Sequence, residues 1–439
     1  MTSSVSLADA SRFWLKLGFV SFGGPAGQIA LLHRELVDQR RWLSEGRYLH
    51  ALNYCMLLPG PEAMQLATYL GWLMHGVPGG LIAGGLFVLP SVFVLTGLAL
   101  LYAAWGEMPV LVSVFAVLKP AVLAIVAMAA WRIGRRSLRT PLLIGLAVAG
   151  FLALSLVRLP YPLLVITAGL VGLAAARWRP ALLVAAKPHG SRSDTPELQG
   201  AALHDDHSET PDHARFSPRR LALTLLAWAL ALLLPLSVLV LVGGWNGTLA
   251  LMARFFTRVA LLSFGGAYAV LPYVAQGAVE QFGWLSAGQM LDGMALGETT
   301  PGPLIMVVAF VAFMGGWNQG LGGSGGNATL AIAATLVAVW FTFLPSFGFI
   351  LAGAPLVEAS RGDLRFGAPL RAISAVVVGM IVSLAVFFAG PVLWPAGVFN
   401  PWALLVAGLA FVAQLVLRWS VLQLIAVAAA VGLLLGVIS

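Results

Sequence analysis

The sequence has very little charge and almost no cysteine. Only 10% of its 439 residues are charged, whereas 60% are hydrophobic, and the mean hydropathy is +0.92. Soluble domains carry about 25% charged residues. The composition therefore excludes a soluble globular protein and indicates a multi-spanning protein of the lipid bilayer. The single cysteine, Cys55, excludes an intramolecular disulfide framework and a cysteine-based metal cluster.

Enzyme signatures are missing as well. The chain contains no HExxH, no GxSxG and no phosphate-binding loop, since its glycine-rich GGSGGN lacks the GK[ST] of that motif. We therefore expect no enzyme activity, no cofactor, no metal and no ATP-driven transport by this chain alone. The net charge of +8 does not indicate nucleic acid, because the arginines lie mostly in short loops between apolar runs and suit membrane orientation.

A polar interval divides the chain. Residues 186–217 hold most of the Asp/His/Ser-rich sequence, and their low hydrophobicity predicts a disordered cytoplasmic linker. The spacing of its histidines fits no standard metal site. We expect four parts, namely a first repeat at 1–180, the linker at 181–218, a connecting membrane helix at 219–245 and a second repeat at 246–439. The N-terminus lacks a signal peptide, so we expect it to be retained and cytoplasmic.

The two halves repeat each other. SFGG occurs at 21–24 and at 263–266, WLS at 42–44 and at 284–286, and PGP at 59–61 and at 301–303. Each pair lies 242 residues apart. Three motifs in one register indicate an internal duplication, and Pro90-Ser91 matches Pro345-Ser346 after the register shifts.

The apolar segments predict that the second repeat is inverted. Each half has about six such segments, and a solitary one at 219–243 stands between them. This odd crossing would bring the second repeat into the membrane from the opposite side. We therefore predict an all-α membrane protein of two inverted-topology repeats, a transporter plan in which the binding site lies between the halves.

One loop pair bears on whether the motif segments span the membrane. Residues 33–47 carry four arginines, whereas the equivalent loop at 275–289 carries none. If every segment spans, the arginine-rich loop faces outward, against the positive-inside rule. If the SFGG and PGP segments are re-entrant hairpins, both loops change side and obey the rule. We favour re-entrant hairpins, and the accessibility of Gln39 tests them.

The breaks at SFGG and PGP are the candidate binding site. Pro61 and Pro303 are predicted to be the first residues of helices, because proline is well placed there. Helix N-termini carry unsatisfied N–H groups and a positive dipole end, so they bind anions. A single PGP is more often a simple kink, but four symmetric breaks favour a site. Its predicted residues are Ser21, Phe22, Gly23, Gly24, Pro59, Gly60, Pro61, Ser263, Phe264, Gly265, Gly266, Thr300, Pro301, Gly302 and Pro303.

Basic and acidic residues complete the predicted site. Lys16 and Arg258 occupy equivalent positions before the two SFGG motifs, and Lys119 matches Arg371. Charge at membrane depth is costly and usually functional, so these four are predicted counter-charges for an anion. Glu62 and Glu298 flank the two PGP motifs without being repeat equivalents. Because an apolar setting favours a protonated carboxyl group, they are candidates for proton coupling, with a structural salt bridge as the alternative.

The motifs resemble those of a known family. FGGPAGQIA with LNYCMLLPGPEAMQLATYLG, and SFGGAYAVLPYV with ETTPGPLIMVVAFVAF, are similar to the two halves of long-chain chromate transporters. The resemblance covers nearly the whole chain apart from the linker. It implies a prokaryotic inner-membrane antiporter that exports chromate, is driven by the proton motive force and confers resistance, with sulfate as a similar competitor. A homodimer is left open.

Three alternatives remain at this point. The first is an importer or exchanger of sulfate or another oxyanion. The second is a membrane enzyme acting on phosphorylated lipid, for which only His50, Ser21 and Ser263 lie near the breaks, without an obvious triad. The third is a passive anion channel.

Overall fold

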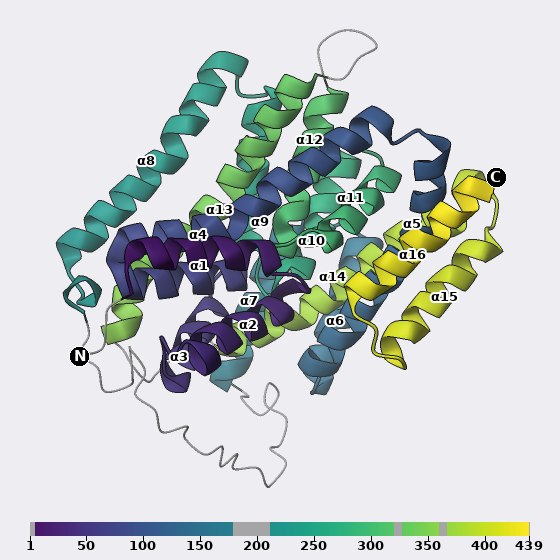
Figure 1. Cartoon of the computed structure of the whole chain (residues 1–439). Coiled ribbons are helices and arrows are strands. Elements are labelled where there is room, and N and C mark those ends of the chain that lie inside the picture. Colours follow the sequence, from purple (N-terminus) through teal and green to yellow (C-terminus); the bar gives the residue numbers. More distant parts are fainter. Residues whose placement is uncertain (1–4, 179–210, 320–326, 360–366, 439) are drawn as a thin grey trace.

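A computed structural model describes residues 5–178, 211–319, 327–359 and 367–438, and all the regular structure in them is helical (Figure 1). Seven of these helices are long and apolar enough to cross a membrane. The prediction of an all-α multi-pass protein is confirmed. Of the four histidines in the polar interval, three lie outside the described residues, namely His189, His204 and His207.

The first half contains seven α-helices. They are α1 (Leu7–Val20), α2 (Gly24–His33), α3 (Glu45–Cys55), α4 (Glu62–Trp105), α5 (Pro109–Ser137), α6 (Pro141–Ser155) and α7 (Tyr161–Trp178), and a π-helix, η1 (Arg34–Gln39), extends α2. The sequence predicts two apolar segments at 48–75 and 78–105. The structure divides α4 at the predicted boundary, because His75 and Gly76 form a non-helical kink at which Gly76 has a left-handed φ of 66°. It begins α4 only at Glu62, after the PGP turn, so the first predicted segment is itself interrupted.

A short turn, η3 (Asp212–Ala214), precedes the helices of the second half. It packs against α4, where a ring nitrogen of His213 lies 2.9 Å from the Trp72 carbonyl oxygen. The helices of the second half are α8 (Pro218–Gly243), α9 (Thr248–Leu262), α10 (Ala267–Ala275), η4 (Gln276–Gln281), α11 (Ala287–Thr299), η5 (Leu304–Met306), α12 (Val307–Asn318), α13 (Ala328–Ala359), α14 (Gly367–Leu393), η6 (Pro395–Gly397), α15 (Pro401–Leu415) and α16 (Val421–Ile438). The solitary segment is α8, a peripheral helix with no buried residue.

The internal repeat is visible in the order and length of the helices. The π-helices η1 and η4 occupy equivalent positions, α6 and α15 both have 15 residues, and α7 and α16 both have 18. The last two helices of each half also pack against the other half, because α6 and α7 contact α14 whereas α15 and α16 contact α5. Such reciprocal packing is what a pseudo-two-fold relation between the halves produces.

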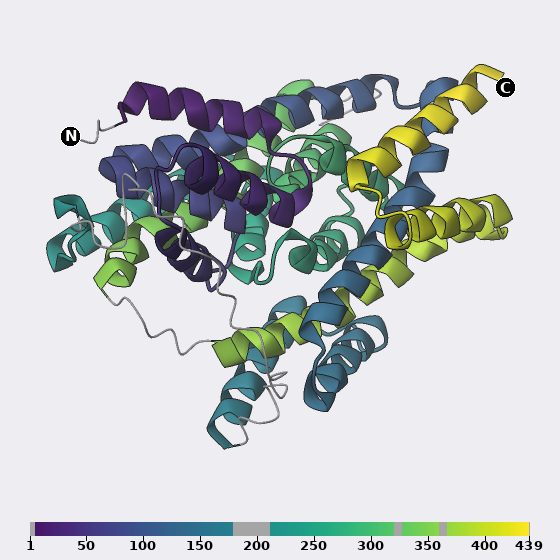
Figure 2. The same cartoon turned by 60° about the horizontal axis from the view of Figure 1, so that its bottom comes forward.

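The helices form two groups (Figure 2). The long helices α5 and α14 run side by side, with α15 and α16 beside one end and α6 and α7 at the other. The remaining helices, α1–α4 and α8–α13, form the second group, in which α4 and α13 pack together with α1 and α9 on them. Helices α10 and α11 connect the groups through contacts with α14 and α5.

Candidate functional site

Both SFGG motifs interrupt a helix. The helix α1 ends at Val20 and α2 begins at Gly24, while α9 ends at Leu262 and α10 begins at Ala267. Gly23 and Gly24 have φ values of 93° and 69°, and Gly265 and Gly266 have 82° and 93°. Only glycine adopts this left-handed region without strain. The paired glycines are therefore required by the backbone path at each break.

Both PGP motifs form turns that end in a new helix. Their prolines Pro61 and Pro303 are the N-cap residues of α4 and η5, one position before the helix, rather than its first residue as predicted. Gly60 and Gly302 have φ values of 128° and 97°. A proline N-cap has no side-chain acceptor for the first N–H groups, and the glycine N-caps of α2 and α10 have none either.

The two kinds of motif meet across the halves. The Gly60 amide donates to the Ser263 carbonyl oxygen at 2.9 Å, and the Gly302 amide donates to the Ser21 carbonyl oxygen at 2.8 Å. Each PGP turn is thus bonded to the SFGG break of the other half. All four breaks therefore gather where the halves join, and Ser21 and Ser263 are buried there.

The serines of the Pro-Ser pairs lie against the PGP glycines, again across the halves. Ser91 of α4 donates its hydroxyl to the Pro301 carbonyl oxygen. A Cβ added at Gly302 would lie 1.7 Å from the Ser91 Oγ, and one at Gly60 would lie 2.2 Å from the Ser346 Oγ. The glycines are required for this close approach as well as for their φ values.

Two buried glutamines brace the same turns. The Gln28 amide donates to the carbonyl oxygens of Ser21 and Gly302. It therefore binds both residues of the hydrogen bond that joins the second PGP turn to the first SFGG break. The Gln65 amide donates to the Pro59 carbonyl oxygen at 2.7 Å. Sequence reasoning missed both glutamines. Their signal was a polar amide a few residues into the helix that follows each first-half break.

The two candidate coupling residues lie beside the breaks. Glu298 is buried at the end of α11 and accepts a hydrogen bond from the Tyr268 hydroxyl of α10. Glu62 is the first residue of α4 and interacts electrostatically with Arg136 of α5. The sequence did not assign Arg136 a place near Glu62.

The predicted counter-charges do not form one cluster. Lys16, Arg258 and Arg371 have exposed side chains on α1, α9 and α14. Lys119 forms an ion pair with buried Asp292 at 3.4 Å, and the Tyr102 hydroxyl donates to the same carboxylate at 2.8 Å. Asp292 is thus the partner of Lys119, which the sequence offered as a counter-charge for a substrate.

The chain as a whole can be compared with known proteins. A family model described as chromate transporter matches residues 8–173 and 250–433, which are the two repeats and the four breaks within them. The chain belongs to the chromate transporter family. The resemblance seen in the motifs is confirmed, and the names of the family and of its curated members point to transport.

Curated relatives agree with the family model. The chain is 33% identical to the chromate transport protein of Pseudomonas aeruginosa, over 84% of this chain and 78% of the relative. It is 29% identical to the probable chromate transport protein of Synechococcus elongatus, over 78% and 76%. It is 27% identical to the chromate transport protein of Cupriavidus metallidurans, over 88% and 83%. No solved structure matches the chain.

Proposed function

We propose that this chain is a secondary active transporter that exports chromate across the prokaryotic inner membrane, driven by the proton motive force, and so gives chromate resistance. Its N-terminus and the 181–218 linker would be cytoplasmic, and the 219–245 helix would connect the repeats at 1–180 and 246–439. The observation that carries the proposal is the reciprocal pair of hydrogen bonds, Gly60 to Ser263 and Gly302 to Ser21. These bonds bring four broken helices of two repeats to one place.

The chemistry suits a tetrahedral dianion. Helix N-termini offer N–H donors and the positive end of a dipole, and the turns before α2, α4, α10 and η5 supply no side-chain acceptor to satisfy them. We assign the fifteen motif residues named above to the binding site on this ground. Lys16, Arg258, Lys119 and Arg371 remain the proposed counter-charges, with Lys119 shared with Asp292.

Coupling would run through Glu62 and Glu298. An apolar setting favours the protonated form of a carboxyl group, and an ionised carboxylate beside a dianion repels it. Protonation of these residues and anion binding would therefore depend on each other. The bond from Tyr268 to Glu298 places such a carboxyl group directly before the second PGP turn.

Flux in everted membrane vesicles tests the proposal. Vesicles from cells that lack other exporters would be given labelled chromate, with and without an imposed proton gradient. We expect accumulation that needs both the chain and the gradient. Flux that ignores the gradient would indicate a passive channel. Uptake of labelled sulfate with no uptake of chromate would indicate a sulfate transporter instead.

A further inference from the structure

A basic, largely open cavity lies where α5 and α15 end. It has a volume of about 470 Å³, and one water molecule needs about 10–15 Å³ on the same measure, so a hydrated anion fits. Arginine dominates its lining, and none of the described residues that line it is acidic. The polar residues that line it are Arg132, Arg135, Arg136, Arg139, Arg418 and Gln414.

These arginines are not used in ion pairs within the described part of the chain, where the close ion pairs involve other basic residues. Arg139 donates from Nε to the Arg136 carbonyl oxygen at 3.1 Å, and Arg135 lies over the Trp131 ring at 5.9 Å. These contacts orient the two guanidinium groups and supply no negative charge. Several positive charges therefore share one cavity.

Gln414 is the second observation that points to a ligand. Its side chain is only 3% exposed, and neither its amide nitrogen nor its amide oxygen has a hydrogen-bond partner among the described residues. A buried polar group left in this way costs about 1–3 kcal/mol. Membrane orientation alone accounts for arginines at a helix end. It does not account for a buried amide without a partner on a residue that lines the same cavity.

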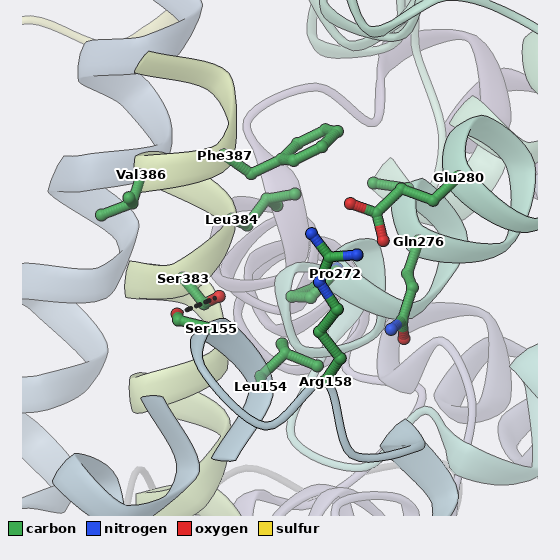
Figure 3. Close-up of a pocket in the computed structure, with 11 residues that line it drawn as sticks. Leu154, Ser155, Arg158, Pro272, Gln276, Glu280, Ser383, Leu384, Val386 and Phe387 are labelled. Carbon is green, nitrogen blue, oxygen red and sulfur yellow. Dashed lines mark hydrogen bonds between the residues drawn. The ribbon is translucent and has the colours of Figure 1, made fainter. Parts of the chain in front are cut away.

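The internal repeat supplies an independent comparison, because a second cavity of about 210 Å³ occupies the equivalent position on the other half (Figure 3). Arg158 in that cavity matches Arg418, and both have a left-handed φ, of 55° and 56°. Figure 3 shows the Arg158 guanidinium group directed toward the Glu280 carboxylate. The second cavity thus holds one arginine and one opposing acid.

At three further equivalent positions, the second cavity has an apolar residue where the first has a polar or basic one. Leu154 occupies the place of Gln414, with α6 in the place of α15. With Lys119 aligned to Arg371, Arg132 corresponds to Leu384 and Arg135 to Phe387. The fold therefore accepts apolar residues at these positions. The polar and basic residues of the first cavity serve something other than packing.

We propose that the arginine cavity between α5 and α15 is a binding site for a tetrahedral oxyanion, which is held there before it reaches the breaks between the halves. This inference rests on the proposed function. Five guanidinium groups would supply charge-assisted hydrogen bonds to the oxyanion, and the Gln414 amide would donate another once its side chain turns toward the anion. The helix α5, which carries three of these arginines, packs on α11, and α11 ends directly before the second PGP turn.

Hydrogen exchange of the purified full-length protein tests the site. The protein would be kept in a neutral maltoside detergent at constant ionic strength, and sodium sulfate or chromate would replace chloride. We expect protection of peptides covering 128–139 and 411–419. Arg418→Gln should weaken the protection roughly tenfold in anion concentration, and Gln414→Leu, which installs the residue of the other cavity, should weaken it severalfold. Arg158→Gln is the matched control and should leave it unchanged.

Three results would overturn the inference. They are no protection of either segment by sulfate or chromate, equal effects of Arg418→Gln and Arg158→Gln, and protection by added phosphatidylglycerol that free anions never produce. The last would make a lipid phosphate the occupant. The assay needs no gradient and no flux. Protection at the cavity in a protein that moves no chromate in vesicles would therefore refute the proposed export and leave the binding site standing.

Discussion

At the scale of single residues, the glycines of the PGP turns are the most constrained positions in the candidate site. Gly302 combines a φ of 97° with a Ser91 Oγ that lies 1.7 Å from where a Cβ would be. Either constraint alone would require glycine at this position. A left-handed residue other than glycine is strained, and even an unstrained one would displace the hydroxyl that bonds Pro301.

We expect Gly302→Ala to abolish chromate flux, because its methyl group pushes Ser91 away and separates the turn from Ser21. Gly85→Ala on α4 is the matched control, since a Cβ there meets nothing within 4 Å. Flux in everted vesicles, normalised to the amount of membrane protein, gives the measurement. Adding Ser91→Gly to Gly302→Ala should restore part of the flux, since it removes the clash but not the backbone strain. Full activity of Gly302→Ala alone would contradict the argument.

The Lys119–Asp292 pair gives a second prediction at this scale. Removing one partner of a fully buried pair costs about 3–5 kcal/mol. Because the Lys119 side chain is 34% exposed, solvent screening should reduce the loss for Lys119→Met to about 1–3 kcal/mol of unfolding free energy. Thermal unfolding in detergent measures it, with Lys16→Met as an exposed control.

The double variant Lys119→Met with Asp292→Asn should recover most of that stability, since the asparagine needs no counter-charge and can still accept from Tyr102. The same pair of variants distinguishes two roles of Lys119. If Lys119 is a structural partner, Lys119→Met lowers the stability of the protein and the double variant restores it. A substrate ligand would lose flux at unchanged stability, and the double variant would not regain flux.

At the scale of elements, the sequence predicted what depends on local pattern. The register of SFGG and PGP located all four breaks, and proline next to helix starts placed α4 and η5 to within one residue. It did not predict that each break bonds the opposite half, as Gly60 bonds Ser263, because such pairing depends on tertiary packing. Gln28 and Gln65 were missed for the same reason, since most of their partners are backbone carbonyls, which carry no sequence signal.

The contact between α10 and α11 carries the coupling prediction. Tyr268 donates to Glu298, and the glutamine in Glu298→Gln can accept the same hydrogen bond but cannot release a proton. We expect this variant to bind anion and to exchange chromate between vesicles and medium, while losing accumulation driven by a proton gradient. The two fluxes are measured in the same vesicles. Gradient-driven accumulation at the wild-type level would exclude Glu298 from coupling and leave Glu62 as the candidate.

At the scale of the whole molecule, the two groups of helices suggest how a site at the breaks could face each side in turn. The group built on α5 and α14 contains the last helices of both halves, and the group built on α4 and α13 contains the first. The breaks lie on helices of the second group that touch the first through α10 and α11. Rocking of one group against the other would therefore alter the surroundings of the breaks most, as alternating access requires.

The last prediction concerns the side of the membrane on which the π-helix η1 lies. The helix α2 and the π-helix η1 that extends it have 10 and 6 residues, and α3 has 11. At about 1.5 Å per residue these segments are about 24 Å and 17 Å long, both shorter than a hydrocarbon core of about 30 Å. Helices of this length can dip into the membrane and return but cannot span it alone. If they do so, Gln39 stays on the cytoplasmic side with the arginines near it. In a Cys55→Ser background, Gln39→Cys should then react with a membrane-impermeant maleimide in everted vesicles and not in intact spheroplasts. Reaction in spheroplasts would mean that these segments together cross the membrane, and the arginines of this loop would then face outward.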